Sequence, residues 1–199
     1  MKTNISLKHI NTLAIPAIIA GISEPILSLT DAAIVGHMPK HATESLAAVG
    51  VVTAFLSMLI WVLGQSRSAI SSIISQYLGA NKLDDVKNLP AQAIAIILLI
   101  SIVVCGLTYP FCSAIFKLYN ASGLLLDYSV SYYKIRVIGL PFTLYTFAVF
   151  GVFRGLQNTY YPMLIAITGS FINIILDIIL VYGINGIFMP LNLKGAAIA

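Results

Sequence analysis

Charged residues are scarce in this sequence. Of its 199 residues, 9% are charged and 59% are hydrophobic, and the mean hydropathy is +0.95. A soluble domain carries about 25% charged residues, because its surface must face water. The scarcity excludes an ordinary soluble fold and indicates a protein whose solvent is the lipid bilayer.

The sequence also lacks any cluster of positive charge. Its formal net charge is +4, but the 11 Lys and Arg residues are scattered, mostly at the ends of apolar runs. Nucleic-acid binding needs a basic patch or stripe on one face. Scattered basic residues at the ends of apolar runs are instead typical of membrane topology signals. Nucleic acid is therefore not expected as a partner.

Cysteine is almost absent, with only Cys105 and Cys112, seven residues apart in one apolar run. On a helix these two residues would lie about 10.5 Å apart along the axis, beyond the reach of a disulfide, which is about 7 Å between Cα atoms. We interpret both as small packing residues. The sequence shows no metal-ligand spacing, so it predicts neither a disulfide scaffold nor a Cys/His metal centre.

Catalytic combinations are missing as well. The three histidines, at positions 9, 37 and 41, lie at the start of the first apolar run or in the loop after it. An intramembrane serine protease needs a Ser with a His base inside the membrane. An aspartyl protease would need paired Asp motifs in a Gly-rich context, which Asp31 and Asp177 lack. We therefore do not expect an enzyme.

Long apolar runs are abundant. A helical membrane span needs about 20 apolar residues, and we expect one transmembrane domain over residues 1–199 with spans at about 7–35, 46–78, 89–116, 124–153 and 161–182. Residues 194–199, KGAAIA, predict the start of a sixth helix. The sequence thus predicts an all-α, multi-spanning bundle. We also expect it to be a fragment, or to have its partner half encoded elsewhere.

Basic residues in the loops predict the orientation. Lys and Arg are enriched in cytoplasmic loops, and the first apolar run is too long for a cleavable signal peptide. With a cytoplasmic N-terminus, the inside carries Lys2, Lys8, Lys82, Lys87 and Arg154, and the outside carries Lys40, Lys117 and Lys194, with Lys134 and Arg136 near the outer end of span four. We expect a multi-pass protein of the plasma membrane with its N-terminus in the cytoplasm.

Acidic residues inside the predicted spans are the sharpest functional signal. An Asp at the bilayer centre costs about 2.5–3.5 kcal/mol on insertion scales, so such residues usually mark ion pathways. Asp177 lies near the middle of span five, and Asn173 lies four residues earlier on the same helix face. A carboxylate beside an amide carbonyl offers oxygen ligands to a proton or a sodium ion. The alternative is a structural hydrogen bond from Asp177 to another helix.

Span one carries two further acidic residues. Glu24 and Asp31 are seven residues apart, which places them on one helix face. Pro16 and Pro25 give this helix places to bend, because proline frees backbone carbonyls. We expect Glu24 to line a cavity. Asp31 belongs either to the cavity or, alternatively, to the membrane interface. Protonation of a cavity carboxylate would change its charge and bias the bend.

The order of the local motifs resembles a known family. The segments LTDAAIVGHM at Asp31, ESLAAVG, SQYLGANKLDDVKN, FRGLQNTYYP, FINIILDIILVYG and KGAAIA follow one another along the chain. This ordered series resembles the MATE (multidrug and toxin extrusion) family, and within it the DinF-like branch. The resemblance covers essentially all of the sequence.

The resemblance implies a fold and an activity. It implies the first of two six-helix bundles, truncated in helix six, with the missing C-terminal lobe in cis or encoded separately. It also implies export of drugs, organic cations or metabolites in exchange for H+ or Na+ by alternating access, with no cofactor beyond this coupling ion. Asp31, Asn173 and Asp177 match the family's cation site, and Pro16 matches the proline at which helix one kinks. Glu24 has no role that the resemblance assigns.

Two other functions stay open at this point. A flippase for lipid-linked oligosaccharides, from the same superfamily, usually needs several cationic residues in its cavity, and the candidates here are Arg67, Lys134 and Arg136. An inactive or accessory half-transporter is the other alternative. Buried acidic residues argue against it, because a scaffold has no reason to bear their insertion cost.

Overall fold

The computed structural model describes residues 6–39, 41–183 and 189–199, and every regular element in this part of the chain is helical. The elements are α1 (Leu7–Gly36), α2 (Ala42–Gly64), α3 (Ser66–Gly79), η1 (Leu83–Val86), α4 (Leu89–Leu118), α5 (Gly123–Arg136), η2 (Val137–Gly139), α6 (Leu140–Gly155), α7 (Tyr160–Tyr182) and α8 (Leu193–Ile198). Lys2 and Lys40, which the orientation prediction uses, lie outside the described residues.

Among the described residues, five helical stretches are long and apolar enough to cross a membrane: Leu7–Gly36, Ala42–Gly79, Leu83–Leu118, Gly123–Gly155 and Tyr160–Tyr182. Many of their large apolar side chains, such as Leu29, Trp61 and Phe171, are exposed. A helix with apolar residues on its outer face suits a lipid environment. The prediction of an all-α, multi-spanning bundle is confirmed.

The second stretch is interrupted at Gln65, where the sequence predicts one continuous span. The Ser66 hydroxyl donates a hydrogen bond to the Leu63 carbonyl at 2.7 Å, and the Gln65 amide donates to the Trp61 carbonyl at 3.2 Å. Side chains therefore satisfy carbonyls at the break between α2 and α3. A Cβ on Gly64 would lie 2.9 Å from the ring of Phe147, so only glycine allows this approach.

The fourth stretch is also divided, because α6 has a proline in its first turn. Pro141 has no backbone N–H, so the Val137 carbonyl, four residues earlier, loses its helical donor. The Cys105 thiol of α4 donates to that carbonyl at 3.2 Å. The helix consequently changes to the short η2 segment before α6 begins.

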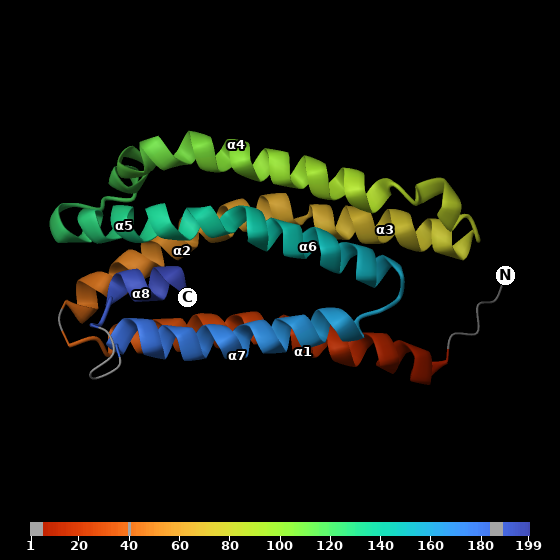
Figure 1. The fold of residues 1–199 in the computed structure, drawn as a ribbon, viewed down its shortest axis with the longest axis horizontal. Helices are drawn as coiled ribbons and strands as arrows, with labels where there is room; N and C mark the ends of the chain where they lie inside the picture. The colour runs from red at the N-terminus through yellow and green to blue at the C-terminus, as the bar shows by residue number, and fades with distance from the viewer. Residues whose placement is uncertain (1–5, 40, 184–188) are drawn as a thin grey trace.

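Helices α1 and α7 lie side by side and run in the same direction (Figure 1). At one end, the Thr159 hydroxyl donates to the Leu13 carbonyl at 2.9 Å. At the other, the Tyr182 hydroxyl donates to the Ile34 carbonyl at 2.9 Å. These bonds fix the register of the pair, so residues near the C-terminal ends of α1 and α7 face each other.

The remaining helices form the larger packed part of the molecule. Phe55, Phe116 and Tyr133 join α2, α4 and α5 in an aromatic cluster, with the Phe116 and Tyr133 ring centroids 5.3 Å apart. The Tyr133 hydroxyl donates to Thr108 at 2.6 Å. Helices α3 and α6 also approach closely, since a Cβ on Gly151 would lie 2.7 Å from the Arg67 carbonyl oxygen. Small residues at such crossings are typical of membrane helices.

Candidate functional site

A cavity of about 680 Å³ lies against the α1–α7 pair and is also lined by α2, α5 and α6. Its wall combines apolar side chains with charged and polar ones. The charged and amide members are Glu24, Asp31, Arg136 and Asn173, and the hydroxyl members are Ser28, Thr53, Ser57, Tyr132 and Thr143. This volume suits a small organic molecule, and a few polar groups in an apolar wall are typical of ligand sites.

Asp31 and Asp177 meet where α1 and α7 run in register. Asp177 is 1% exposed, whereas Asp31 is half-buried and lines the cavity. The two carboxyl groups lie close enough for one to donate a hydrogen bond to the other when it is protonated. Asp177 does not line the cavity itself. The structure thus places one carboxyl on the cavity wall and the other directly behind it.

Four buried oxygen atoms at this place accept no hydrogen bond from the described part of the chain. They are Asp31 Oδ1, Asn173 Oδ1 and both carboxyl oxygens of Asp177. Buried polar atoms are paired in the large majority of cases. A cluster of unpaired acceptors is suited to a ligand that brings positive charge or a proton.

Asn173 is held in place by its own donor. Its amide nitrogen donates to the Ala199 carbonyl at 2.7 Å, which ties α7 to the end of the described chain after α8. Because the nitrogen is engaged there, the amide oxygen remains as an acceptor beside the carboxyl pair. The i, i+4 spacing of Asn173 and Asp177 on α7 brings both to the same side of the helix.

The donor set fits a proton or a monovalent ion better than a bound transition metal. In residues 6–39, 41–183 and 189–199, no group of three His, Cys, Asp or Glu side chains comes together. The available donors are two carboxyl groups and one amide oxygen, all hard oxygen ligands. Such ligands suit Na+ at the three residues, or H+ at the carboxyl pair.

Arg136 and Tyr132 belong to the same wall. The sequence analysis named Arg136 only as a cationic candidate for a flippase cavity, and it did not single out Tyr132. The Arg136 guanidinium lies within electrostatic range of Asp177 and of the Tyr132 hydroxyl. Sequence reasoning placed Arg136 near the outer end of span four. It lies instead about 20 Å along the helix from Gly123, on the cavity wall. A basic residue within an apolar run was the available signal for Arg136, and Tyr132 had none.

Glu24 and the two prolines lie on α1. Glu24 lines the cavity, two helical turns before Asp31. Pro16 and Pro25 both lie inside α1, which remains helical from Leu7 to Gly36. Neither proline can donate to the carbonyl four residues earlier, so each weakens the helix locally. Pro25, one of these two weak points of α1, therefore lies between Glu24 and Asp31.

Comparisons with known proteins match most of this chain. The sequence profile of the MatE family matches residues 16–179. The chain is 28% identical over 188 residues to DNA damage-inducible protein F of Escherichia coli K12, covering 94% of this chain and 39% of that protein. It is 24% identical over 195 residues to the probable multidrug resistance protein NorM of Thermotoga maritima, covering 96% of this chain and 40% of that protein.

Solved structures show the same fold. A MOP superfamily transporter from Pyrococcus furiosus matches with a TM-score of 0.82 at 25% identity, covering 96% of this chain and 40% of that one. A MATE transporter crystallised in a bent conformation matches with a TM-score of 0.85 at 24% identity, covering 96% of this chain and 41% of that one. This chain therefore spans about two fifths of the length of its relatives, as expected for the predicted N-terminal lobe.

Proposed function

Because this chain belongs to the MatE family, we propose that it forms one lobe of a secondary antiporter. The antiporter exports drugs, organic cations or metabolites in exchange for H+ or Na+. The observation that carries the proposal is the group of unpaired buried oxygens at Asp31, Asn173 and Asp177 beside a cavity of about 680 Å³. They offer a coupling ion a site next to the space for the substrate.

The mechanism follows from the position of Asp31 between the ion and the cavity. A proton or Na+ bound at the carboxyl pair removes negative charge from the wall that attracts a cationic substrate. Binding of the ion and of the substrate therefore oppose each other, and this opposition is reciprocal by thermodynamic linkage. The weak points of α1 at Pro16 and Pro25 allow this helix to adopt a different bend when the charge changes. Each bend would expose the cavity to a different side of the membrane.

The chain is a multi-pass membrane protein, and we place it in the plasma membrane with its N-terminus in the cytoplasm. Lys8, Lys82, Lys87 and Arg154 support this orientation, because they lie at the α1 start, in the α3–α4 connection and at the α6 end. These positions are at one end of the bundle (Figure 1). Its partners are the lipid bilayer, a small-molecule substrate and a second lobe, in cis or encoded separately.

The other classes receive less support. A flippase cavity needs several cationic residues, whereas this cavity has Arg136 alone among the described residues, against Glu24 and Asp31. The names of the relatives describe multidrug resistance and export proteins, which supports a transporter without enzymatic activity.

The test is dye export by the protein expressed from its native reading frame, in inside-out vesicles under an imposed H+ or Na+ gradient. Asp31→Asn and Asp177→Asn should each abolish gradient-driven transport. Asp127→Asn is the matched control, since Asp127 is an exposed acid on α5 that does not line the cavity. Undiminished transport in the first two variants would remove these residues from the mechanism. No transport by the unaltered protein with every dye and both ions would favour an accessory half.

A further inference from the structure

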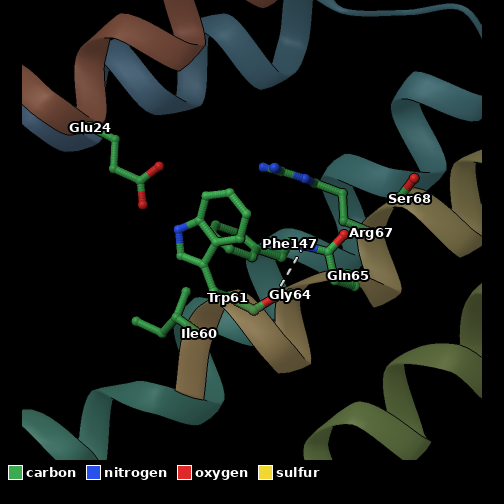
Figure 2. Close-up of a pocket in the computed structure, with 8 residues that line it drawn as sticks. All are labelled: Glu24, Ile60, Trp61, Gly64, Gln65, Arg67, Ser68 and Phe147. Carbon is green, nitrogen blue, oxygen red and sulfur yellow. Dashed lines mark hydrogen bonds between the residues drawn. The ribbon is translucent and has the colours of Figure 1, made fainter. Parts of the chain in front are cut away.

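A second, smaller pocket of about 170 Å³ lies between α1, the α2–α3 break and α6. Its residues are shown in Figure 2: Glu24, Ile60, Trp61, Gly64, Gln65, Arg67, Ser68 and Phe147. Glu24 and Ile60 also line the large cavity. The two spaces are therefore adjacent.

Arg67 supplies a positively charged, well-anchored side of the pocket. Its guanidinium carbon lies 4.7 Å from the centroid of the Phe147 ring, a cation–π contact that orients the group. The backbone of Arg67 is equally constrained, because its carbonyl packs directly on Gly151 of α6. A guanidinium has five N–H donors at its edge. Because Arg67 lines the pocket, these donors are within its wall and suit an anionic group.

Glu24 supplies the opposite charge. Figure 2 shows the Arg67 guanidinium pointing toward the side on which the Glu24 carboxylate lies, with the Trp61 indole in the space between them. Within residues 6–39, 41–183 and 189–199, neither side chain forms an ion pair. Charges within a membrane span are costly and usually pair or serve a ligand. Two opposite charges that face one pocket without pairing are suited to a ligand that carries both.

Trp61 supplies an aromatic surface between the two charges. Its side chain is 74% exposed, although it lies beside the pocket. Its backbone carbonyl is held by the Gln65 amide across the helix break. An exposed indole next to a carboxylate provides a stacking surface for an aromatic ring and a cation–π contact for an amine.

We propose that this pocket is a dipolar subsite for aromatic zwitterions, which binds their amine at Glu24 and their carboxylate or phosphate at Arg67, with the ring against Trp61. The inference rests on the proposed transport function and names the class of solute that this lobe takes. Glu24, which lines both spaces, would be the point at which this subsite meets the large cavity. A purely cationic solute would use Glu24 but leave Arg67 without its anion.

The test uses a matched set of small probes and the intrinsic fluorescence of Trp61, the single tryptophan of this sequence. The probes are 4-(aminomethyl)benzoate, its methyl ester, which is only a cation, and its N-acetyl derivative, which is only an anion. Binding to the native protein in detergent is followed without any ion gradient. The difference from Trp61→Phe isolates the Trp61 signal.

We expect the zwitterion to bind at least about tenfold more tightly than the ester, the minimum for one charge-assisted hydrogen bond. Arg67→Gln should remove this preference. Arg67→Lys should retain most of it, and binding by this variant would show that the fold tolerates a change at this position. Glu24→Gln should weaken both the zwitterion and the ester. Lys134→Gln is the matched control, because Lys134 makes a similar cation–π contact, with Tyr109, but lies outside both spaces.

Equal binding of zwitterion and ester in the unaltered protein would overturn the proposal, as would a preference that survives Arg67→Gln. The second result would mean that Arg67 serves only to pack on Phe147. Neither result touches the proposed antiport, which is read from gradient-driven dye export. If the unaltered protein shows the zwitterion preference but no gradient-driven dye export, the proposed antiport is overturned and the proposed subsite is not.

Discussion

Two regions of this molecule bury polar atoms, and they differ in whether those atoms are hydrogen-bonded. In the aromatic core, the Tyr133 hydroxyl donates to Thr108, which in turn donates to the Val104 carbonyl. At the α1–α7 pair, the buried oxygens of Asp31, Asn173 and Asp177 accept nothing within the described part of the chain. Both regions are built from helices long and apolar enough to cross a membrane, so the membrane environment alone does not explain the contrast.

The difference separates stability from function. A satisfied hydrogen bond adds modest stability, whereas a buried acceptor without a partner carries its full desolvation cost. The aromatic core is built from satisfied groups and close ring contacts. The α1–α7 pair retains unsatisfied groups, which is the expected design of a site that binds and releases an ion. Substitutions should therefore affect transport in one region and folding in the other.

The largest effect should come from Asp177→Asn. This variant keeps the shape of the side chain but replaces a carboxyl that can carry a proton by an amide that cannot. Gradient-driven dye export should fall to that of vesicles without the protein. The thermal unfolding temperature in detergent should not decrease, because the new amide can donate to the unpaired Asp31 oxygen. A variant that unfolds earlier would mean that Asp177 is structural.

Phe116→Ala should produce the largest loss of stability. Phe116 is fully buried between Phe55 and Tyr133, and removal of a core aromatic ring costs about 3–5 kcal/mol. The folded fraction should still export dye at the normal rate per molecule. Unfolding curves and transport per folded protein check the two halves of this prediction. Loss of transport in the folded fraction would break the separation between the two regions.

Tyr133→Phe should have a smaller effect of the same kind. It removes one hydrogen bond, to Thr108, and keeps the ring contacts, at a cost of about 0.5–1.5 kcal/mol. Export should be unchanged at all gradients. A change in the ion dependence of transport would show instead that the aromatic core communicates with the cation site.

The smallest effect is expected for Tyr182→Phe. Its hydroxyl donates to the Ile34 carbonyl and joins α7 to α1 near Asp31, but the side chain is 40% exposed. We expect a loss of stability of under about 1 kcal/mol, at the low end for one hydrogen bond. Thermal unfolding measures it, and a loss as large as that of Phe116→Ala would contradict the assignment of stability to the aromatic core.

Much of this architecture was predictable from the sequence. The all-α bundle followed from runs of about 20 apolar residues or more, and the resemblance to the MATE family is confirmed by the profile match over residues 16–179. The i, i+4 spacing was sufficient to predict that Asn173 and Asp177 share one helix face. The roles of Asp31, Asn173 and Asp177 in cation coupling stay predictions.

What the sequence did not reveal depends on contacts between distant segments. Arg136 was visible as a basic residue within an apolar run, but its place on the cavity wall depends on where α5 lies relative to α1 and α7. Next to the break at Gln65, Gly64 is approached closely by Phe147, more than eighty residues away in the sequence. The change of helix at Val137 was missed, because the sequence predicted one span at 124–153; Pro141 was the available signal, whereas the contact with the Cys105 thiol had none.

The most direct test of the central claim counts the cations that substrate binding displaces from the purified native protein. Protons are followed with a pH-sensitive dye in weak buffer, and sodium by equilibrium dialysis with the radioactive ion. The account predicts that a bound dye displaces H+ or Na+ from the unaltered protein and from Tyr133→Phe, but not from Asp177→Asn. Equal displacement from Asp177→Asn would contradict it, because the unpaired oxygens at the α1–α7 pair would then not be the cation site.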